Sequence, residues 1–363
     1  MRPAAHAATG AARRRSRVRL VRTGLALSLT ACALGFVPAH AQGQPEPRPA
    51  SASASEPKLE AKPESKLPAR SDLAAGSFRF GVIGHSFKTG ADETVLKRAI
   101  AGATQGRPAF VVATGVKAES EPCSDKLYAS RYALLDASSV PMVVSLAGSD
   151  WSACLNSAGR SNAIDRLNRL RELFYRDSET LGAKRLPVTR LSGSAKFRSY
   201  AENAHWQVGK VLFATINLPA NNNHYRAEAG RNSEYEDRLV ANRAWLHRLF
   251  TLAVRQKMEG LVLFSDGDVG LETEPGFSLL PRFETKRDGF AEPRKQIKTL
   301  AAKFRGKVLL VDTQIVEAAA KEPSIHWQDN VGHLNLAADW TEVRVAPASA
   351  TLFAVRGPAD TVP

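Results

Sequence analysis

Short apolar runs alternate with amphipathic stretches between residues 78 and 356. The apolar runs are four to six residues long and rich in β-branched and aromatic residues, which is typical of buried strands. These predicted strands are Phe78–Ile83, Ala109–Ala113, Met142–Leu146, Val211–Ile216, Leu261–Phe264 and Val308–Val311. Apolar residues at helical spacing between them predict helices. The predicted helices are Asp92–Ala103, Ser124–Asp136, Asn162–Phe174 and Glu234–Lys257.

Two strand-like segments, Trp340–Val345 and Thr351–Val355, lie near the end of the chain on either side of Pro347. They predict a hairpin. Strand–helix alternation that ends in a hairpin indicates an α/β layered fold with a mixed sheet. In such folds the functional loops lie beyond the carboxyl ends of the strands. We therefore expect a site among residues 84–86, 114–117, 147–151, 217–224, 265–268 and 312–314.

The first 41 residues have the pattern of an export signal. Seven arginines and no acidic residue precede an apolar stretch from Leu25 to Val37, and Ala39-His40-Ala41 supplies small residues for cleavage before Gln42. This predicts a signal peptide and a periplasmic or secreted protein with no transmembrane helix after processing. The alternative is a lipoprotein anchored through Cys32, because Leu29–Cys32 resembles a lipobox.

Residues 42–76 hold six prolines, a Ser-Ala repeat and no apolar period, which predicts a disordered linker. The domain organisation expected is therefore a signal peptide (1–41), a linker (42–76), one domain (77–357) and a short flexible tail (358–363). Two cysteines remain after the leader, Cys123 and Cys154. In an oxidising compartment they are expected to form a disulfide, with two separate buried thiols as the alternative.

The net charge of the chain says little about its partners, because half of it lies in the leader. The chain carries +14, of which the arginines of the leader supply +7. The remaining +7 shows no dense basic stripe with interleaved aromatics, so specific nucleic-acid binding is not expected. Binding to an anionic polymer or a membrane surface is a hypothesis that rests on this residual charge alone. No P-loop, dinucleotide fingerprint or Gly-x-Ser-x-Gly elbow occurs in the sequence.

Several segments resemble a bacterial branch of the calcineurin-like metallophosphoesterases. The most specific are Ala109–Ser124 (AFVVATGVKAESEPCS) and Pro141–Cys154 (PMVVSLAGSDWSAC). The others are Asn162–Gly182, Leu212–Asn223, Arg238–Phe250 and Asn330–Val345. The resemblance implies an α/β/β/α sandwich with two central mixed sheets. It also implies two metal ions that clamp a phosphate ester and activate a water.

The metal-ligand positions of that family are not kept here. Gly84-His85 stands where Gly-Asp is expected, and Thr114–Lys117 (TGVK) lacks the bridging aspartate. Gly148–Trp151 (GSDW) is one residue shorter than the family's Gly-Asp-Asn-Glu-Trp, and Asn217 and Asp312–Gln314 stand near positions that hold histidines in the family. The residues expected to line the vestigial cleft are Gly84, His85, Gly115, Ser149, Asp150 and Asn222.

These observations favour an exported, metallophosphoesterase-like protein without catalytic activity, which acts by binding an unknown ligand or an envelope protein. No cofactor is then expected. The alternative is an active phosphoesterase with a rebuilt, possibly single-metal site for Mn, Fe or Zn. Its candidate ligands are His85, Asp150, Asp266 and Asp312. Asp266-Gly267-Asp268 is typical of a turn, with a cation site as its own alternative.

Overall fold

The computed structural model describes residues 76–84, 93–227, 230, 232–270, 288–314, 323–336, 338–347 and 349–356. These residues all belong to one unit within residues 67–363. The expected signal peptide, its cleavage site, Cys32, residues 42–75 of the expected linker, His85 and the expected tail lie outside the described residues.

The first sheet is built from strands at both ends of the domain. Its strands are β1 (Phe78–Ile83), β2 (Val111–Thr114), β3 (Met142–Ser145), β11 (Trp340–Val345) and β12 (Phe353–Arg356). They lie in the order β12-β11-β1-β2-β3. The sheet is mixed, because β1 pairs in parallel with β2 but antiparallel with β11. The predicted hairpin is confirmed as β11 and β12, which pair antiparallel with Val345 opposite Phe353.

The second sheet has seven strands in the order β4-β5-β6-β7-β8-β10-β9. Their bounds are β4 Thr189–Arg190, β5 Ala204–Val208, β6 Val211–Thr215, β7 Gly260–Phe264, β8 Lys307–Asp312, β9 His326–Gln328 and β10 Val331–Asn335. The central strands β6, β7, β8 and β10 run in parallel, and β4, β5 and β9 pair antiparallel with their neighbours. The carboxyl ends of the parallel strands therefore meet at one edge.

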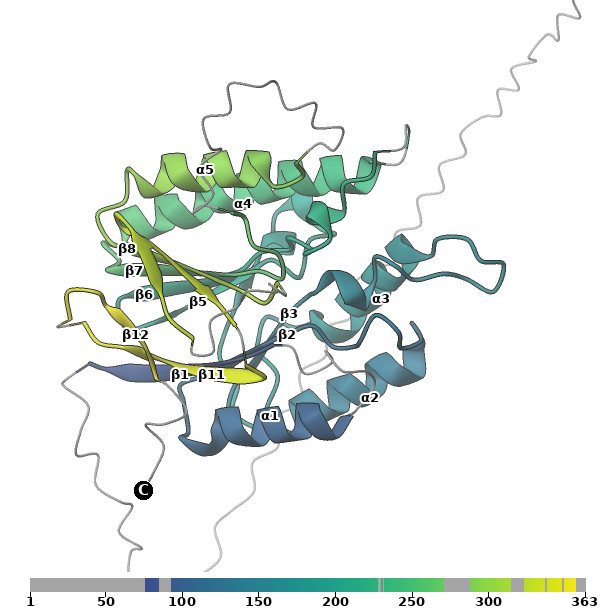
Figure 1. Cartoon of the computed structure of the whole chain (residues 1–363), viewed down its shortest axis with the longest axis horizontal. Helices are drawn as coiled ribbons and strands as arrows, with labels where there is room; N and C mark the ends of the chain where they lie inside the picture. The colour runs from purple at the N-terminus through teal and green to yellow at the C-terminus, as the bar shows by residue number, and fades with distance from the viewer. Residues whose placement is uncertain are drawn as a thin grey trace, which may run out of the picture. The chain divides into compact units, whose positions relative to one another are not determined.

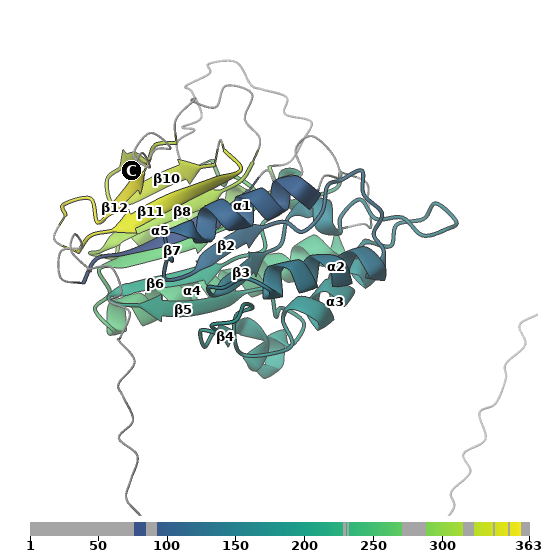
Figure 2. The same cartoon turned by 90° about the horizontal axis from the view of Figure 1, so that it is seen from below.

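Helices cover the outer face of each sheet (Figures 1 and 2). The first sheet carries α1 (Glu93–Gln105), α2 (Asp125–Asp136) and α3 (Ala163–Phe174), and the second carries α4 (Ser233–Arg255) and α5 (Ala291–Ala301). Short 3-10 turns occupy 148–150, 191–193, 195–197 and 222–224. None of the helices in the described ranges is long and apolar enough to cross a membrane.

Three apolar layers hold the sandwich together. The layer between the two sheets is rich in aromatic side chains, with Phe80, Phe110 and Phe213 in mutual ring contact at 4.8–5.4 Å between centroids. A second layer lies between the first sheet and α1–α3, and a third lies between the second sheet and α4–α5. Successive side chains of each central strand point to opposite faces of the sheet, and both faces are covered by an apolar layer. The central strands are therefore apolar along their whole length.

The expected α/β fold with two mixed sheets between helical layers is confirmed. The observed helices start and end within a few residues of the predicted ones, as with α4 at Ser233–Arg255. The pattern missed β5 (AHWQV) because only Ala204 and Trp206 are buried on it, so it lacks a continuous apolar run. It also missed α5, whose polar face dominates its composition.

The predicted disulfide is present. Cys123 lies just before α2, Cys154 follows β3, and their Cα atoms are 5.9 Å apart. Cys154 is buried beside Tyr128, whose hydroxyl donates to the main-chain oxygen of Asp150 at 2.7 Å. The bond therefore fastens the loop after β3 to the start of α2, close to the carboxyl edge of the first sheet.

Replacement of both cysteines by serine is expected to lower the free energy of unfolding by about 3 kcal/mol, because the bridge closes a long loop of the unfolded chain. Urea unfolding of the wild type and the double variant Cys123→Ser/Cys154→Ser measures this difference. Dithiothreitol should shift the wild type to the midpoint of the variant and leave the variant unchanged. Equal midpoints without reductant would contradict the expectation.

Candidate functional site: a polar cleft at the carboxyl ends of the strands

A cleft of about 530 Å³ opens where the loops after β2, β3, β6, β7 and β8 converge. This is the edge at which α/β folds place their ligands. Its polar lining comes from Thr114, Lys117, Glu119, Ser149, Ser152, Asn221, Asp266, Thr313 and Gln314. Gly115 also lines it and has φ +80°, so the sharp turn after β2 favours glycine.

Asp150 fastens two of these loops from beneath the cleft. One carboxylate oxygen accepts the main-chain N–H groups of Val116 (2.8 Å) and Lys117 (3.2 Å), and the other accepts that of Ala147 (2.8 Å). The residue is fully buried. Burial raises the pKa of Asp150 to about 7, against the effect of the hydrogen bonds from Val116 and Ala147. The carboxylate thus serves as an acceptor for the loop backbone.

Lys117 places a buried ammonium group in the same region. Its Nζ donates to the main-chain oxygens of Ala118 (2.6 Å) and Ser149 (2.8 Å), and only 2% of the residue is exposed. Burial lowers the pKa of Lys117, and the charge of Asp150 opposes that shift. A cation supplied by the chain itself therefore lies between the loops after β2 and β3.

Asp266 links the two sheets. Its Oδ2 accepts the main-chain N–H of Gly148 at 2.7 Å, from the loop after β3, and that of Ala220 at 2.8 Å, from the loop after β6. Its Oδ1 accepts the Thr313 hydroxyl at 3.4 Å. Burial raises the pKa of Asp266, and these hydrogen bonds oppose the shift. Residues from three loops thus meet on one carboxylate.

The loop after β6 is held by an ion pair within α4. Arg238 is fully buried, and its guanidinium donates to Glu234 (2.7 Å), to the main chain of Asn217 (3.2 Å) and to both oxygens of Asn223. His224 Nδ1 lies 3.0 Å from the other oxygen of Glu234. Burial raises the pKa of Glu234, but Arg238 and His224 outweigh it and bring that pKa to about 2. This network fixes the cleft wall that carries Asn221.

Asp312 ends β8 on the face that α5 covers. Its Oδ2 lies 2.5 Å from His333 Nε2 of β10, and Asp268 Oδ1 lies 3.7 Å from the same nitrogen. Burial raises the pKa of Asp312, His333 opposes that shift, and the charge of Asp268 adds to it. Asp312 therefore has different partners from Asp150. It pairs with His333 on the face of the second sheet that α5 covers, whereas Asp150 accepts N–H groups from loops of the first sheet.

The structure brings together some of the residues expected from the sequence. Gly115 and Ser149 line the cleft, and Asp150 lies buried below it. Gly84 is buried where an added Cβ would meet the Thr313 side chain at 2.6 Å. Asn222 instead accepts the main-chain N–H of Gly289 at 2.9 Å, and the neighbouring Asn221 lines the cleft.

Lys117 and Gln314 lie in loops that the sequence predicted for the site, but neither was singled out, because single polar residues in loops give no periodic signal. Ser152, one residue beyond the predicted loop 147–151, was missed. His333 was missed as well. The alternation along β10, with Leu334 facing the other sheet, places His333 on the face of Asp312 once the strand is recognised.

The described residues of the cleft do not fit a two-metal centre. Such a centre needs several free carboxylates and imidazoles that converge from different loops. Here both oxygens of Asp150 accept main-chain N–H groups, and Lys117 brings a positive charge. Asp150, Asp266 and Asp312 were the candidate ligands of a rebuilt metal site. In the part of the chain that the structure describes, their carboxylates do not form a group with oxygen atoms within 4.8 Å of one another.

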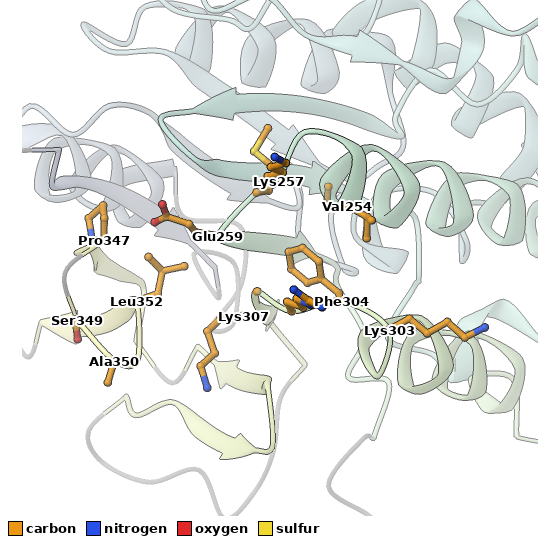
Figure 3. A pocket seen from close by; sticks show the side chains of 14 residues that line it. Val254, Lys257, Glu259, Lys303, Phe304, Lys307, Pro347, Ser349, Ala350 and Leu352 are labelled. Atoms are coloured by element: carbon orange, nitrogen blue, oxygen red, sulfur yellow. The ribbon is translucent and has the colours of Figure 1, made fainter.

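A larger groove of about 860 Å³ lies at the opposite ends of β7 and β8 and carries Lys257, Lys303, Arg305 and Lys307. Figure 3 shows the amines of Lys303 and Lys307 pointing away from each other. Lys307 lies instead over the ring of Trp327, 5.1 Å from its centroid. These two positive charges therefore do not converge on one position, as binding of a small anion between them would require.

Comparison with known proteins gives a distant structural neighbour. No family model and no curated protein matches the sequence. A solved structure described as the structure of PhoD matches with a TM-score of 0.45 and 12% sequence identity. The match covers 77% of this chain and 66% of that one, slightly less than two thirds of its length. The α/β assignment rests on the layers and strand orders described above.

Asp150→Asn is expected to lower the free energy of unfolding by about 1–3 kcal/mol. Both carboxylate oxygens accept N–H groups, so either orientation of the new amide points an N–H at another N–H. Thermal or urea unfolding measures the loss. Asp165→Asn, at an exposed position of α3, is the matched control and should leave stability unchanged. Equal stability of the two variants would contradict the bracing role of Asp150.

The pH dependence of stability should reveal Glu234. Its pKa falls from 4.5 to about 2 on folding, so the unfolded chain binds the proton more readily. The stabilisation is therefore complete above about pH 5 and is lost as the pH falls from about 4.5 to 2. Glu234→Gln should lower the free energy of unfolding at pH 7 by about 3 kcal/mol, a difference that shrinks towards pH 2.

The control for that experiment is Glu236→Gln, an exposed position in the same turn of α4. It should follow the wild type across the whole pH range. A difference between Glu234→Gln and wild type that stays constant from pH 7 to pH 2 would show that the ion pair does not lower the pKa.

Proposed function

We propose that this chain is an exported protein of the phosphoesterase-like fold whose cleft binds a polar ligand and does not hydrolyse phosphate esters. The observation that carries the proposal is the use of Asp150 and Asp266 as acceptors for loop N–H groups. Residues at these strand ends hold metals in the family that the sequence resembles. In this chain the same part of the fold uses its carboxylates to shape a cleft.

The lining indicates the chemistry of the ligand. Ser149, Ser152, Asn221, Thr313 and Gln314 offer uncharged hydroxyl and amide groups at the cleft. Lys117 is basic and Glu119 and Asp266 are acidic, and the presence of both kinds of group disfavours a highly charged ligand. A volume of about 530 Å³ suits a small molecule or a few sugar rings. The ligand class that fits best is therefore a neutral, hydroxyl-rich compound such as an oligosaccharide.

The proposed location rests on the leader and on the disulfide. The basic and apolar leader has the composition of an export signal. The Cys123–Cys154 bond is the kind of cross-link that persists in an oxidising compartment. Both features support a periplasmic or secreted protein, with a lipid anchor at Cys32 as the alternative.

A panel of phosphomonoesters and phosphodiesters tests the loss of hydrolysis. With added Mn²⁺, Zn²⁺ or Fe²⁺, the purified protein should give no turnover above the protein-free background. Metal-dependent turnover that Asp266→Asn abolishes and Asp165→Asn retains would overturn the proposal, because it would place a working metal in the cleft.

Saturation-transfer NMR with neutral oligosaccharides tests the binding role. Asn221→Ala should weaken any bound oligosaccharide by roughly 2- to 10-fold, the effect of one lost hydrogen bond. Asn168→Ala, at an exposed position of α3, should leave the signal unchanged. Equal signals from both variants would place the ligand outside the cleft.

A further inference from the structure

Three side chains of types that commonly bind metals lie close together outside the cleft, on the face of the second sheet that α5 covers. Asp268 follows β7, Asp312 ends β8 and His333 lies on the neighbouring strand β10. His333 Nε2 lies 2.5 Å from Asp312 Oδ2 and 3.7 Å from Asp268 Oδ1. The three ligand atoms all lie within 4.8 Å of one another. Bonds of about 2.0–2.2 Å from one tetrahedral ion place its ligand atoms roughly 3.3–3.6 Å apart, so His333 and Asp312 would separate by about 1 Å when an ion replaces the hydrogen bond between them.

Neighbouring groups hold Asp312 in the orientation that a ligand needs. Its other oxygen, Oδ1, accepts the side-chain amide of Asn335 at 2.8 Å and the main-chain N–H of Gln314 at 3.0 Å. These two bonds turn Oδ2 toward His333. Carboxylates that bind metals are oriented by outer hydrogen bonds of this kind.

A small cavity lies against the three side chains. Its other walls are mostly apolar, including Leu263, Leu310 and Ile297 of α5, with Ser265 as a further polar residue. The space for the centre of a water-sized sphere is about 10 Å³, which is room for one water or one small ion. Apolar walls keep bulk water away and strengthen the attraction between carboxylates and a cation.

The local charge is negative. Asp266, Asp268 and Asp312 lie at the ends of two adjacent strands. In the described part of the chain, the imidazole of His333 is the basic group that pairs with Asp268 and Asp312, and Asp266 is bonded to main-chain N–H groups and a hydroxyl. A divalent cation would neutralise this excess of carboxylates.

We propose that Asp268, Asp312 and His333 bind a single divalent transition-metal ion such as Zn²⁺ or Mn²⁺. One imidazole and two carboxylates suit these metals, and the imidazole disfavours Ca²⁺ and Mg²⁺, which prefer oxygen ligands. On binding, the metal replaces the proton shared by His333 Nε2 and Asp312 Oδ2, and that proton passes to solvent. The site is separate from the two-metal centre that the family resemblance implies, because it lies on the face covered by α5.

The ion would stiffen one wall of the cleft. The main-chain N–H of Asp268 donates to the Gln314 side chain at 2.9 Å, and Gln314 lines the cleft. A metal that joins the ends of β7, β8 and β10 thus fixes the two loops from which Asp266, Thr313 and Gln314 reach the ligand. Its role is structural, and it supports the cleft without entering it.

Metal content of the full chain, purified without a polyhistidine tag, tests the proposal. After loading with Zn²⁺ or Mn²⁺ and dialysis, elemental mass spectrometry should find about one ion per wild-type chain. Removing a ligand should reduce affinity by at least the roughly 10–100-fold typical of outer-shell changes, so His333→Gln and Asp268→Asn should retain almost none. His326→Gln, at an exposed position on adjacent β9, should bind like the wild type.

Circular dichroism and thermal unfolding complete the test. Zn²⁺ should raise the Tm of the wild type and of His326→Gln, and should not change that of His333→Gln or Asp268→Asn. A metal-free wild type would overturn the proposal, and so would full metal content in a folded His333→Gln or Asp268→Asn. Metal that depends on Asp266 and not on His333 would overturn it too, and would also contradict the proposed loss of the metal centre in the cleft.

Discussion

The carboxylate of Asp266 is the constraint on which the cleft depends. It belongs to the second sheet, yet one of its oxygens accepts an N–H from the first sheet's loop after β3. The same oxygen accepts an N–H from the loop after β6. The aromatic layer between the sheets sets their distance, but apolar contacts are non-directional and do not fix loops. A buried acceptor with directed partners fixes them, and Asp150 does the same within the first sheet.

This arrangement shows how side chains of the chain itself can hold together the loops at the carboxyl ends of the strands. Buried main-chain N–H and C=O groups in such loops must find hydrogen-bond partners. Asp150, Asp266 and the ammonium of Lys117 supply these partners. Acidic residues at the ends of strands can therefore serve as acceptors for loop N–H groups.

The layered fold could be predicted from the sequence because buried parallel strands are continuous apolar runs. Phe78–Ile83 and Val308–Val311 were recognisable on that ground, and the hairpin at Trp340–Val345 was recognisable by its turn. The site was harder to predict from the sequence, because its residues come from loops that are far apart in the sequence and close together only in the folded chain. Asp312 was a candidate from the sequence, but only the pairing of β8 with β10 places His333 beside it. Lys117 lay in a loop expected at the site, but nothing in a short loop predicts that its ammonium group is buried.

The disulfide links the oxidation state of two cysteines to the geometry of the cleft. Cys154 lies four residues after Asp150, and Tyr128 bonds the main chain of Asp150 from the helix that begins beside Cys123. Oxidation of two cysteines that do not line the cleft thus locks the carboxylate that shapes it. The geometry of this wall of the cleft therefore depends on the oxidation state of two side chains outside it.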